Sequence, residues 1–216
     1  MKCVVRRVLI VMAAILGIVL AQVAPASATT AKNLENNLAT LWTAVLETPS
    51  PQNPFGSGGA AFACINIGDG TLAPFAGGPE LSCTVTRDTK IFVVGYSWEC
   101  SSFTGDHTSN TGDNFVYGTN AGQLRQCARN NDLQEAPTVT VDGTSVTVTE
   151  VETSPLNIVL PADNIFSEPA GKHGKSVAHG WVTLLKPLTV GEHQIVVEDP
   201  IHGTTVTTIV VTAPGP

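Results

Sequence analysis

The sequence predicts an all-β sandwich, of the jelly-roll or immunoglobulin-like type, with one amphipathic helix at its N-terminal end. Short segments that alternate apolar and polar residues recur from about residue 61 to the end of the chain, separated by turn residues. Only residues 31–47 repeat their apolar side chains at helical spacing. Many short strands with a single helix favour packed sheets over a parallel α/β fold.

The first 28 residues have the features of a secretory signal peptide. Three basic residues precede an apolar run over residues 8–20, and Ala26 and Ala28 stand at the spacing that signal peptidase prefers. The run is shorter than the roughly 20 residues that span a bilayer. We therefore expect cleavage after Ala28, secretion into the medium or periplasm, and no membrane anchor.

The 188 residues after the signal peptide suffice to bury a hydrophobic core. We expect them to form a helix over 29–48 and a disulfide-stapled sandwich domain over 49–216. They hold eight Lys and Arg against 18 Asp and Glu, a net charge of −10. An acidic chain without a basic stripe repels nucleic acid and anionic lipid. Neither is an expected partner, and no motif predicts a cofactor.

The expected helix is followed by a loop and then by strands. Its apolar face consists of Leu34, Leu38, Leu41, Trp42, Val45 and Leu46. Residues 49–59 are rich in Pro, Gly and Ser, which is typical of a loop. In the strand "KIFVVGYSWEC", alternation at period two predicts one shared face for Phe92, Val94, Tyr96, Trp98 and Cys100.

The second half of the chain contains a hairpin signal and four further candidate strands. Asp142 and Gly143 separate two alternating Val/Thr runs, a strong hairpin signal. Strands are also expected at "LNIVL", "GWVTLLK", "HQIVVED" and "TTVTTIVVT". Residues 101–131 are polar and lack periodicity, so we interpret them as a long excursion that Cys127 ties back to the sheet.

Four cysteines, Cys64, Cys83, Cys100 and Cys127, remain after the signal peptide, an even number in an oxidising compartment. Two disulfides are therefore predicted. Three pairings are open, and Cys64 with Cys83 and Cys100 with Cys127 is favoured, because both close short local loops. A cysteine zinc site is not expected, because no C-x-x-C pair is present.

The segment "AGKHGKS", residues 170–176, is similar to part of a phosphate-binding loop. The glycine that such a loop needs at its start is replaced by Pro169, and the segment lies between expected strands rather than between a strand and a helix. We interpret it as an exposed loop that binds no nucleotide.

Four segments together carry a resemblance to a known kind of protein: "CTVTRDTKIFVVGYSWECSS", "LRQCA", "LPADNIF" and "SVAHGWVTLLKPLTVGEHQIVV". Over about residues 64–198 the chain resembles an uncharacterised family of secreted bacterial and fungal β-sandwich proteins. The resemblance implies the sandwich fold and secretion, and it implies no activity. In the family pattern an Asp stands at the position of His179 and an aromatic pair lies near Trp181, so this chain departs from the pattern there.

Catalytic motifs are scarce. No G-x-S-x-G serine elbow is present. Glu99, Asp163 and Glu168 are the candidates for a glycosidase carboxylate pair, which only geometry can test. Alternation directs Glu99 away from the core, which favours a solvated surface carboxylate.

Metal-binding signals are weak. The five histidines, His107, His173, His179, His193 and His202, include no H-x-H pair, so no histidine metal site is predicted. The segment "GDHTSNTGDN" offers hard oxygen ligands for calcium in Asp106, Asn110, Asp113 and Asn114, but its spacing does not match a calcium-binding loop.

Two functions remain open from the sequence. One is a non-catalytic secreted module that binds an extracellular glycan or protein, with Trp181 and Tyr117 as stacking platforms and Glu99, Asp163 and His179 as further candidate ligand-binding residues. The alternative is a secreted hydrolase with an unrecognised carboxylate or metal site. The missing nucleophile, base and metal motifs favour the binding module.

Overall fold

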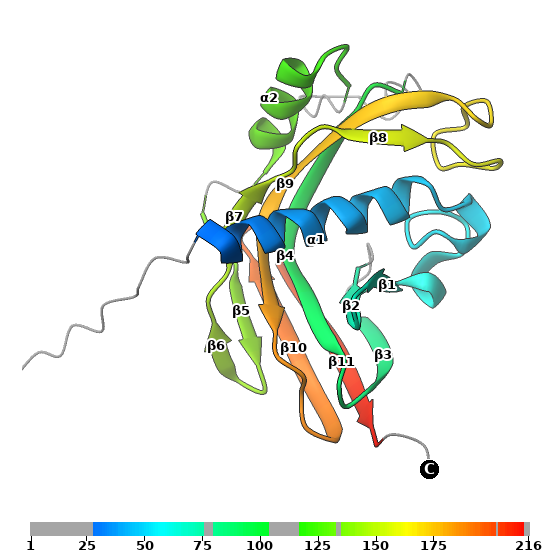
Figure 1. Ribbon diagram of the computed structural model, residues 1–216. Coiled ribbons are helices and arrows are strands. Elements are labelled where there is room, and N and C mark those ends of the chain that lie inside the picture. Colours follow the sequence, from blue (N-terminus) through cyan, green and yellow to red (C-terminus); the bar gives the residue numbers. More distant parts are fainter. Residues whose placement is uncertain (1–27, 76–79, 104–116, 133–134, 202, 214–216) are drawn as a thin grey trace, which may run out of the picture.

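The computed structural model describes residues 28–75, 80–103, 117–132, 135–201 and 203–213. Residues 1–27 of the expected signal peptide lie outside these ranges, and Ala28, its last residue, is the first residue of the first helix. Within them the chain is mostly β-structure in two sheets, accompanied by two α-helices and two short 3-10 turns (Figure 1). Neither described helix is both long and apolar enough to cross a membrane.

The helices are α1 (Ala28–Leu46) and α2 (Ala121–Asn131), and the 3-10 turns are Ser50–Gln52 and Gly59–Phe62. The strands are β1 (Cys64–Gly68), β2 (Thr71–Pro74), β3 (Glu80–Thr86), β4 (Lys90–Ser101), β5 (Thr138–Val141), β6 (Thr144–Val146), β7 (Thr149–Glu152), β8 (Leu156–Val159), β9 (His173–Leu185), β10 (Gly191–Asp199) and β11 (Gly203–Thr212). The first sheet has the order β1-β2-β4-β9-β7, with β8 also paired to β9, and the second has the order β3-β11-β10-β5-β6.

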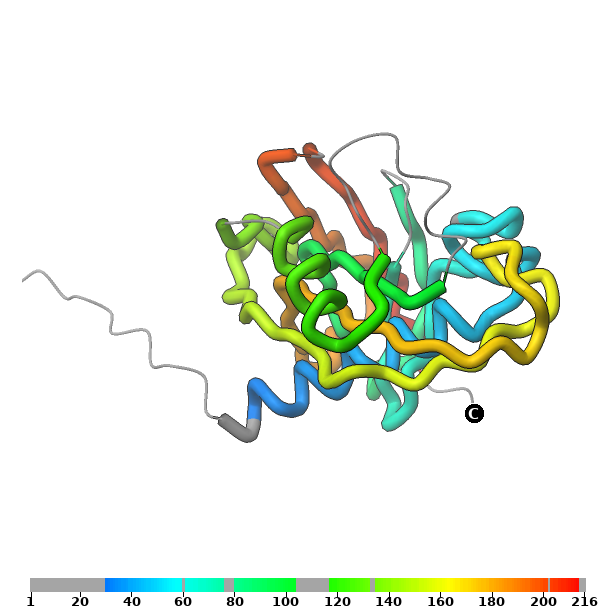
Figure 2. Tube along the Cα trace, turned by 90° about the horizontal axis from the view of Figure 1, so that it is seen from above, coloured from blue at the N-terminus to red at the C-terminus, as the bar shows by residue number. Residues whose placement is uncertain are grey.

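Helix α1 covers one face of the first sheet. Leu38 and Leu41 are fully buried there against Phe92 of β4 and Val182 of β9. The predicted apolar face is confirmed, since Leu34, Leu38, Leu41, Val45 and Leu46 are all buried and Trp42 is partly buried. Seen from above, α1 lies on one side of this sheet, and α2 and the second sheet lie on the other (Figure 2).

The second sheet packs on the opposite face of the first, as in a sandwich. Ile91 and Val93 of β4 are buried against Ile195 of β10 and Ile209 of β11. Branched side chains suit such strands, because they pack well on a pleated surface. Both faces of β4 are therefore covered at this end, one by α1 and the other by the second sheet.

A β-bulge at Gly95 overturns the predicted single face of β4. The pairing with β9 shifts register between Val94 and Tyr96, so the alternation changes sides there. Phe92 and Val94 belong to the α1 side, whereas Trp98 and Cys100 pack on the α2 side. A side chain at position 95 would meet Cγ of Pro137 at 2.8 Å, so glycine is needed at this close approach.

The segment around residue 120 is the second correction. The sequence predicts a long excursion over residues 101–131 that Cys127 ties back to the sheet. The attachment through Cys127 is confirmed, but the last part of the stretch is helix α2. Leu124, Cys127 and Ala128 form the buried face of this helix against Val177 of β9. Three apolar positions are enough, because the disulfide and polar contacts supply the remaining attachment.

The "AGKHGKS" segment is the third correction. Residues 173–176 belong to β9, where they pair with β8, and Ser176 is fully buried. The backbone N–H of Lys175 donates to Oγ of Ser102 at 2.8 Å, which ties this strand end to the residue after β4. The exposed loop is therefore confined to the residues before His173.

The predicted hairpin and disulfides are confirmed. Val141 pairs with Thr144 across a turn in which Asp142 and Gly143 both have positive φ, the conformation of the favoured hairpin turn. Cys64 is bonded to Cys83, and Cys100 to Cys127. Two disulfides fit an extracellular or periplasmic location.

Candidate functional site

Helix α2 begins at a polar cap. The side chain of Asn120 accepts a hydrogen bond from the backbone N–H of Gln123 at 3.1 Å. Oε1 of Gln123 accepts from both the N–H and the hydroxyl of Thr119, each at 2.8 Å. These bonds satisfy donors at the start of the helix, much as a capping box does.

Two kinds of bond fasten α2 to the first sheet. The disulfide joins Cys127 in the middle of the helix to Cys100 at the end of β4. Arg125 and Arg129 both pair with Glu152 of β7, their Nε atoms lying 3.2 Å and 2.5 Å from its carboxylate oxygens. The opposite side of the helix is left as a surface made of neutral polar side chains.

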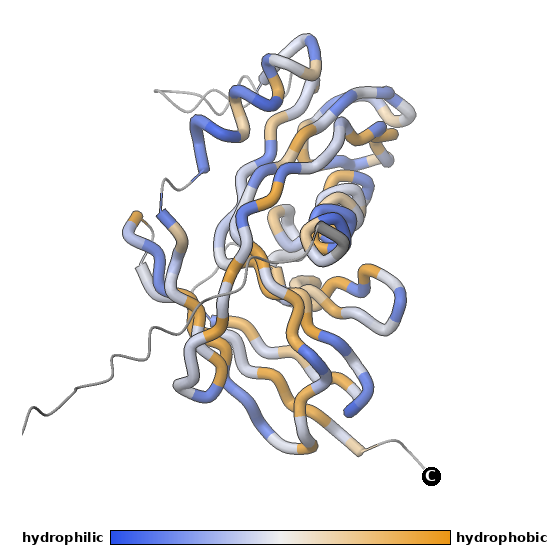
Figure 3. Tube along the Cα trace, turned by 60° about the vertical axis from the view of Figure 1, so that its left-hand side comes forward, coloured by the Kyte–Doolittle hydropathy of each residue, from blue (hydrophilic) through white to orange (hydrophobic). Residues whose placement is uncertain are grey.

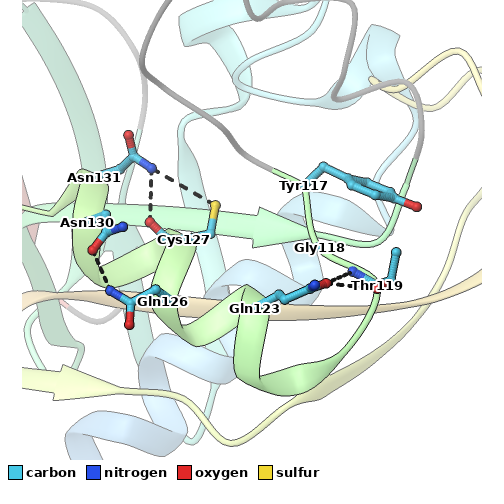
Figure 4. Close-up of a pocket in the computed structure, with 8 residues that line it drawn as sticks. All are labelled: Tyr117, Gly118, Thr119, Gln123, Gln126, Cys127, Asn130 and Asn131. Atoms are coloured by element: carbon cyan, nitrogen blue, oxygen red, sulfur yellow. Dashed lines mark hydrogen bonds between the residues drawn. The ribbon is translucent and has the colours of Figure 1, made fainter.

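A groove of about 380 Å³ lies along that surface. It is lined by Tyr117, Gly118, Thr119, Gln123, Gln126, Cys127, Asn130 and Asn131 (Figure 4). The ring of Tyr117 stands at one end, and the amides of Gln126 and Asn130 stand at the other. No lining residue carries a charge, although the chain as a whole is strongly acidic.

The amide groups in the groove have defined orientations. Gln123 uses Oε1 for its two bonds to Thr119, and neither of these bonds uses its Nε2 hydrogens. Nε2 of Gln126 donates to Oδ1 of Asn130 at 2.6 Å. Gln126 therefore retains an acceptor oxygen and Asn130 retains donor hydrogens. Such a mixture of donors and acceptors matches hydroxyl groups, which both donate and accept.

A cluster of three ionisable side chains lies where α2 ends. Asp132 is the C-cap of α2, His179 lies on β9 and Glu150 on β7, and one potential metal-ligand atom from each falls within 4.8 Å of the others. Nδ1 of His179 contacts the Asp132 carboxylate, and its Nε2 lies 3.6 Å from Oε1 of Glu150. His179 and Asp132 are buried, whereas half of the Glu150 side chain is exposed.

Aromatic side chains surround the cluster. Trp98 is directly opposite His179 in the β4–β9 pairing, and Tyr96 is opposite Trp181. Burial, together with the nearby charges of Asp132 and Asp199, raises the pKa of Tyr96 to about 12, so its hydroxyl stays protonated. That hydroxyl donates to the backbone oxygen of Asn131 at 3.3 Å, one residue before Asp132. Nε1 of Trp98 is buried and has no hydrogen-bond partner among the described residues.

The carboxylates that the sequence suggested do not form a comparable group. Glu99 is on the face opposite Trp98, as expected, but it is only partly exposed and accepts a hydrogen bond from the buried Ser176 hydroxyl. Asp163 is exposed in the turn after β8. Glu168 pairs with Lys172 at 2.8 Å. Among the described residues, the one group of three close His, Cys, Asp or Glu side chains is the cluster at His179.

The remaining candidates are scattered. Trp181 is half-buried on β9, next to the cluster and apart from the residues that line the groove. His193 pairs with Asp142 at 2.7 Å near the β5–β6 hairpin. The proposed calcium ligands at 106–114 lie outside the described residues, as do His107 and His202.

Sequence reasoning singled out Tyr117 and His179 but missed their partners. The N-cap signal of Asn120 followed by Gln123 could have revealed α2 and with it the polar side of the groove. Asp132 and Glu150 carry no local signal, because 47 and 29 residues separate them from His179 in the sequence. Only the sheet topology brings them together.

Comparison with known proteins adds no relative. No family model, no curated protein and no solved structure matches this chain.

Proposed function

We propose that this protein is a secreted, non-catalytic module that binds an uncharged extracellular glycan in the groove beside α2. The observation that carries the proposal is the composition of that groove, which combines one tyrosine ring with several amides and no charge. Ligand pockets typically combine an aromatic or apolar surface with a few well-placed polar groups.

The chemistry of the lining suits a sugar. The apolar face of a pyranose ring can stack on Tyr117, as expected for an amphipathic aromatic at a binding surface. The amides of Gln123, Gln126 and Asn130 can then exchange hydrogen bonds with sugar hydroxyls. A net charge of −10 after signal cleavage repels acidic polysaccharides, which favours neutral glycans.

We also propose that the first 28 residues direct secretion and are removed, and that the sandwich is of the immunoglobulin-like or jelly-roll type. Two disulfides support the first statement, and two sheets packed face to face support the second. The parallel pairs β2–β4 and β3–β11 distinguish the fold from an all-antiparallel version of either type.

A binding assay tests the proposal. The mature protein would be incubated with insoluble neutral glycans such as cellulose, chitin and β-1,3-glucan, and with an anionic glycan for comparison. We expect saturable binding to a neutral glycan, reduced by about 5- to 150-fold in Tyr117→Ala, if a sugar ring stacked on Tyr117 contributes as much as a nucleic-acid base stacked on an aromatic side chain, about 1–3 kcal/mol. Phe62→Ala, which removes another half-exposed aromatic in the turn before β1, is the matched control and should bind normally.

Equal binding by the Tyr117→Ala and wild-type proteins would contradict the groove as the site. Retention on protein-rich cell-wall fractions but on no purified glycan would instead favour a protein partner. In both cases the circular dichroism spectrum of the variant should match the wild type.

The alternative, a hydrolase, has one observation in its favour, which is the His179 cluster with its two carboxylates. Assays against polysaccharide, ester and peptide substrates test it, with Glu99→Gln, Asp163→Asn and Glu150→Gln as variants. We expect no turnover from any form. A wild-type activity that falls by 10² or more in one correctly folded variant would identify a catalytic carboxylate.

A further inference from the structure

The spacing within the His179 cluster is unusual for a hydrogen bond. Nε2 of His179 and Oε1 of Glu150 are 3.6 Å apart, beyond the range in which an imidazole N–H bonds a carboxylate. Two ligands of one tetrahedral zinc ion, each about 2.1 Å from the metal, stand about 3.4 Å apart. The two atoms are therefore separated as ligands of a common ion are.

The other nitrogen of the ring is occupied in the manner of metal-binding histidines. Nδ1 of His179 contacts the carboxylate of Asp132, which itself is buried. A carboxylate at Nδ1 fixes the ring orientation and the tautomer, and leaves the lone pair of Nε2 directed at the metal. Asp132 is thus placed to position His179 while Glu150 and His179 supply ligand atoms.

The surroundings of the cluster attract a cation. Asp132 caps the C-terminal end of α2, where the helix dipole is negative and a carboxylate is unfavourable without a positive partner. Glu150 adds a second carboxylate, and its side chain is half exposed, so an ion can enter from solvent. Arg125 and Arg129 make their ion pairs with Glu152, and Arg129 interacts with Glu150 only at longer range, without an ion-pair contact.

We propose that Glu150 and His179 bind one divalent transition-metal ion of the zinc class, with Asp132 as the positioning residue and water in the remaining coordination positions. Imidazole with carboxylate suits zinc, copper and nickel better than calcium or magnesium. The proposal does not depend on glycan binding, because none of these three residues lines the groove.

To test the proposal, the mature protein is treated with a chelator and then titrated with metal ions. Isothermal calorimetry measures the binding, and thermal unfolding measures the change in melting temperature. Zinc chloride should bind with one ion per chain and raise the melting temperature, whereas magnesium should do neither. Glu150→Gln should weaken zinc binding at least tenfold, and Asp132→Asn by about 10- to 100-fold. Two exposed residues provide matched controls, since His173→Gln and Glu192→Gln should bind zinc as the wild type does.

His179→Gln should abolish binding, but it changes a buried residue and its fold must be verified. Glu150→Gln tests the same site without this difficulty, because the Glu150 side chain is half exposed and its replacement should not disturb the fold. Wild-type protein that takes up no zinc at millimolar concentration would overturn the proposal. Equal zinc affinity in Glu150→Gln and the wild type, or loss of binding in His173→Gln, would overturn it as well, by placing the ion elsewhere.

Discussion

The second sheet and α2 pack against the same face of the first sheet, yet they are held there by different forces. The second sheet is attached by a continuous apolar contact in which Ile91 and Val93 of β4 meet Ile195 and Ile209. Helix α2 buries only three residues and relies on a disulfide, two arginines and a histidine for the rest. Figure 3 shows the contrast: α2 is mostly hydrophilic, whereas hydrophobic and hydrophilic residues alternate along the strands below it.

The boundary between the two regions is the bulge at Gly95. Pro137, the residue before β5, lies against Gly95, so the chain leaves the α2 region and enters the second sheet at that point. We therefore expect the apolar end to contribute most of the stability of the fold, whereas the polar end positions groups that can bind ligands. Both candidate sites lie at the polar end.

The largest expected effect comes from the apolar end. Ile209→Ala removes a fully buried side chain from the sheet–sheet contact and should lower the free energy of unfolding by about 4 kcal/mol. Leu124→Ala, an equally buried residue of α2, should cost about 2 kcal/mol, because a helix on the surface can shift to fill the space. Urea denaturation measures both. A larger loss for Leu124→Ala would reverse the comparison.

Removal of the disulfide at the polar end should have the next largest effect. Cys100→Ala combined with Cys127→Ala opens a link across 27 positions, which corresponds to about 3.5 kcal/mol of loop-closure entropy. We expect the loss to be local, with faster hydrogen exchange in α2 and unchanged exchange in β10 and β11. Simultaneous loss of protection in the second sheet would show that the two regions unfold as one unit.

The ion pairs of α2 should contribute much less. Glu152→Gln removes the partner of Arg125 and Arg129, both of which are substantially exposed, so we expect a loss of about 0.5–1 kcal/mol. The effect should shrink as salt is raised, because salt screens exposed charges. A loss that does not change between low and high salt would indicate a packing role for Glu152.

The smallest effect belongs to the apolar end and depends on pH. The hydrogen bond with Asp142 raises the pKa of His193, and the same bond lowers the pKa of Asp142. The pair contributes its full stability between the unfolded-state pKa of Asp142 and the unfolded-state pKa of His193. The contribution is lost as pH rises through the raised folded-state pKa of His193, and as pH falls through the lowered folded-state pKa of Asp142. Asp142→Asn should therefore destabilise most near about pH 5 and least above about pH 8. A pH-independent difference would contradict this.

Much of the fold follows from local sequence. The hairpin turn at Asp142 and Gly143 and the apolar face of α1 depend on local sequence, and both predictions are confirmed. The bulge at Gly95 was missed, because strict alternation continues through it in the sequence. The close approach of Pro137, which requires glycine at position 95, comes from a residue 42 positions away.

The candidate sites were less accessible to sequence reasoning. Helix α2 has few apolar residues, so its periodicity is faint, and its attachment depends on Cys100 and Glu152 from distant strands. The His179 cluster requires the register of β7 on β9, in which Glu150 pairs with Trp181 and Glu152 with His179. No spacing within one segment encodes that arrangement.

The last strand of the second sheet pairs in parallel with its first. Val206 of β11 lies beside Glu80 of β3, 126 positions earlier, and Ile91 of β4 pairs with Leu185 of β9 across 94 positions. Contacts of such long range form slowly, because the chain loses conformational entropy in closing large loops before strand pairing stabilises it. The second sheet cannot be completed until β11 has been synthesised. Until then, the edge of β3 that pairs with β11 lacks its partner strand.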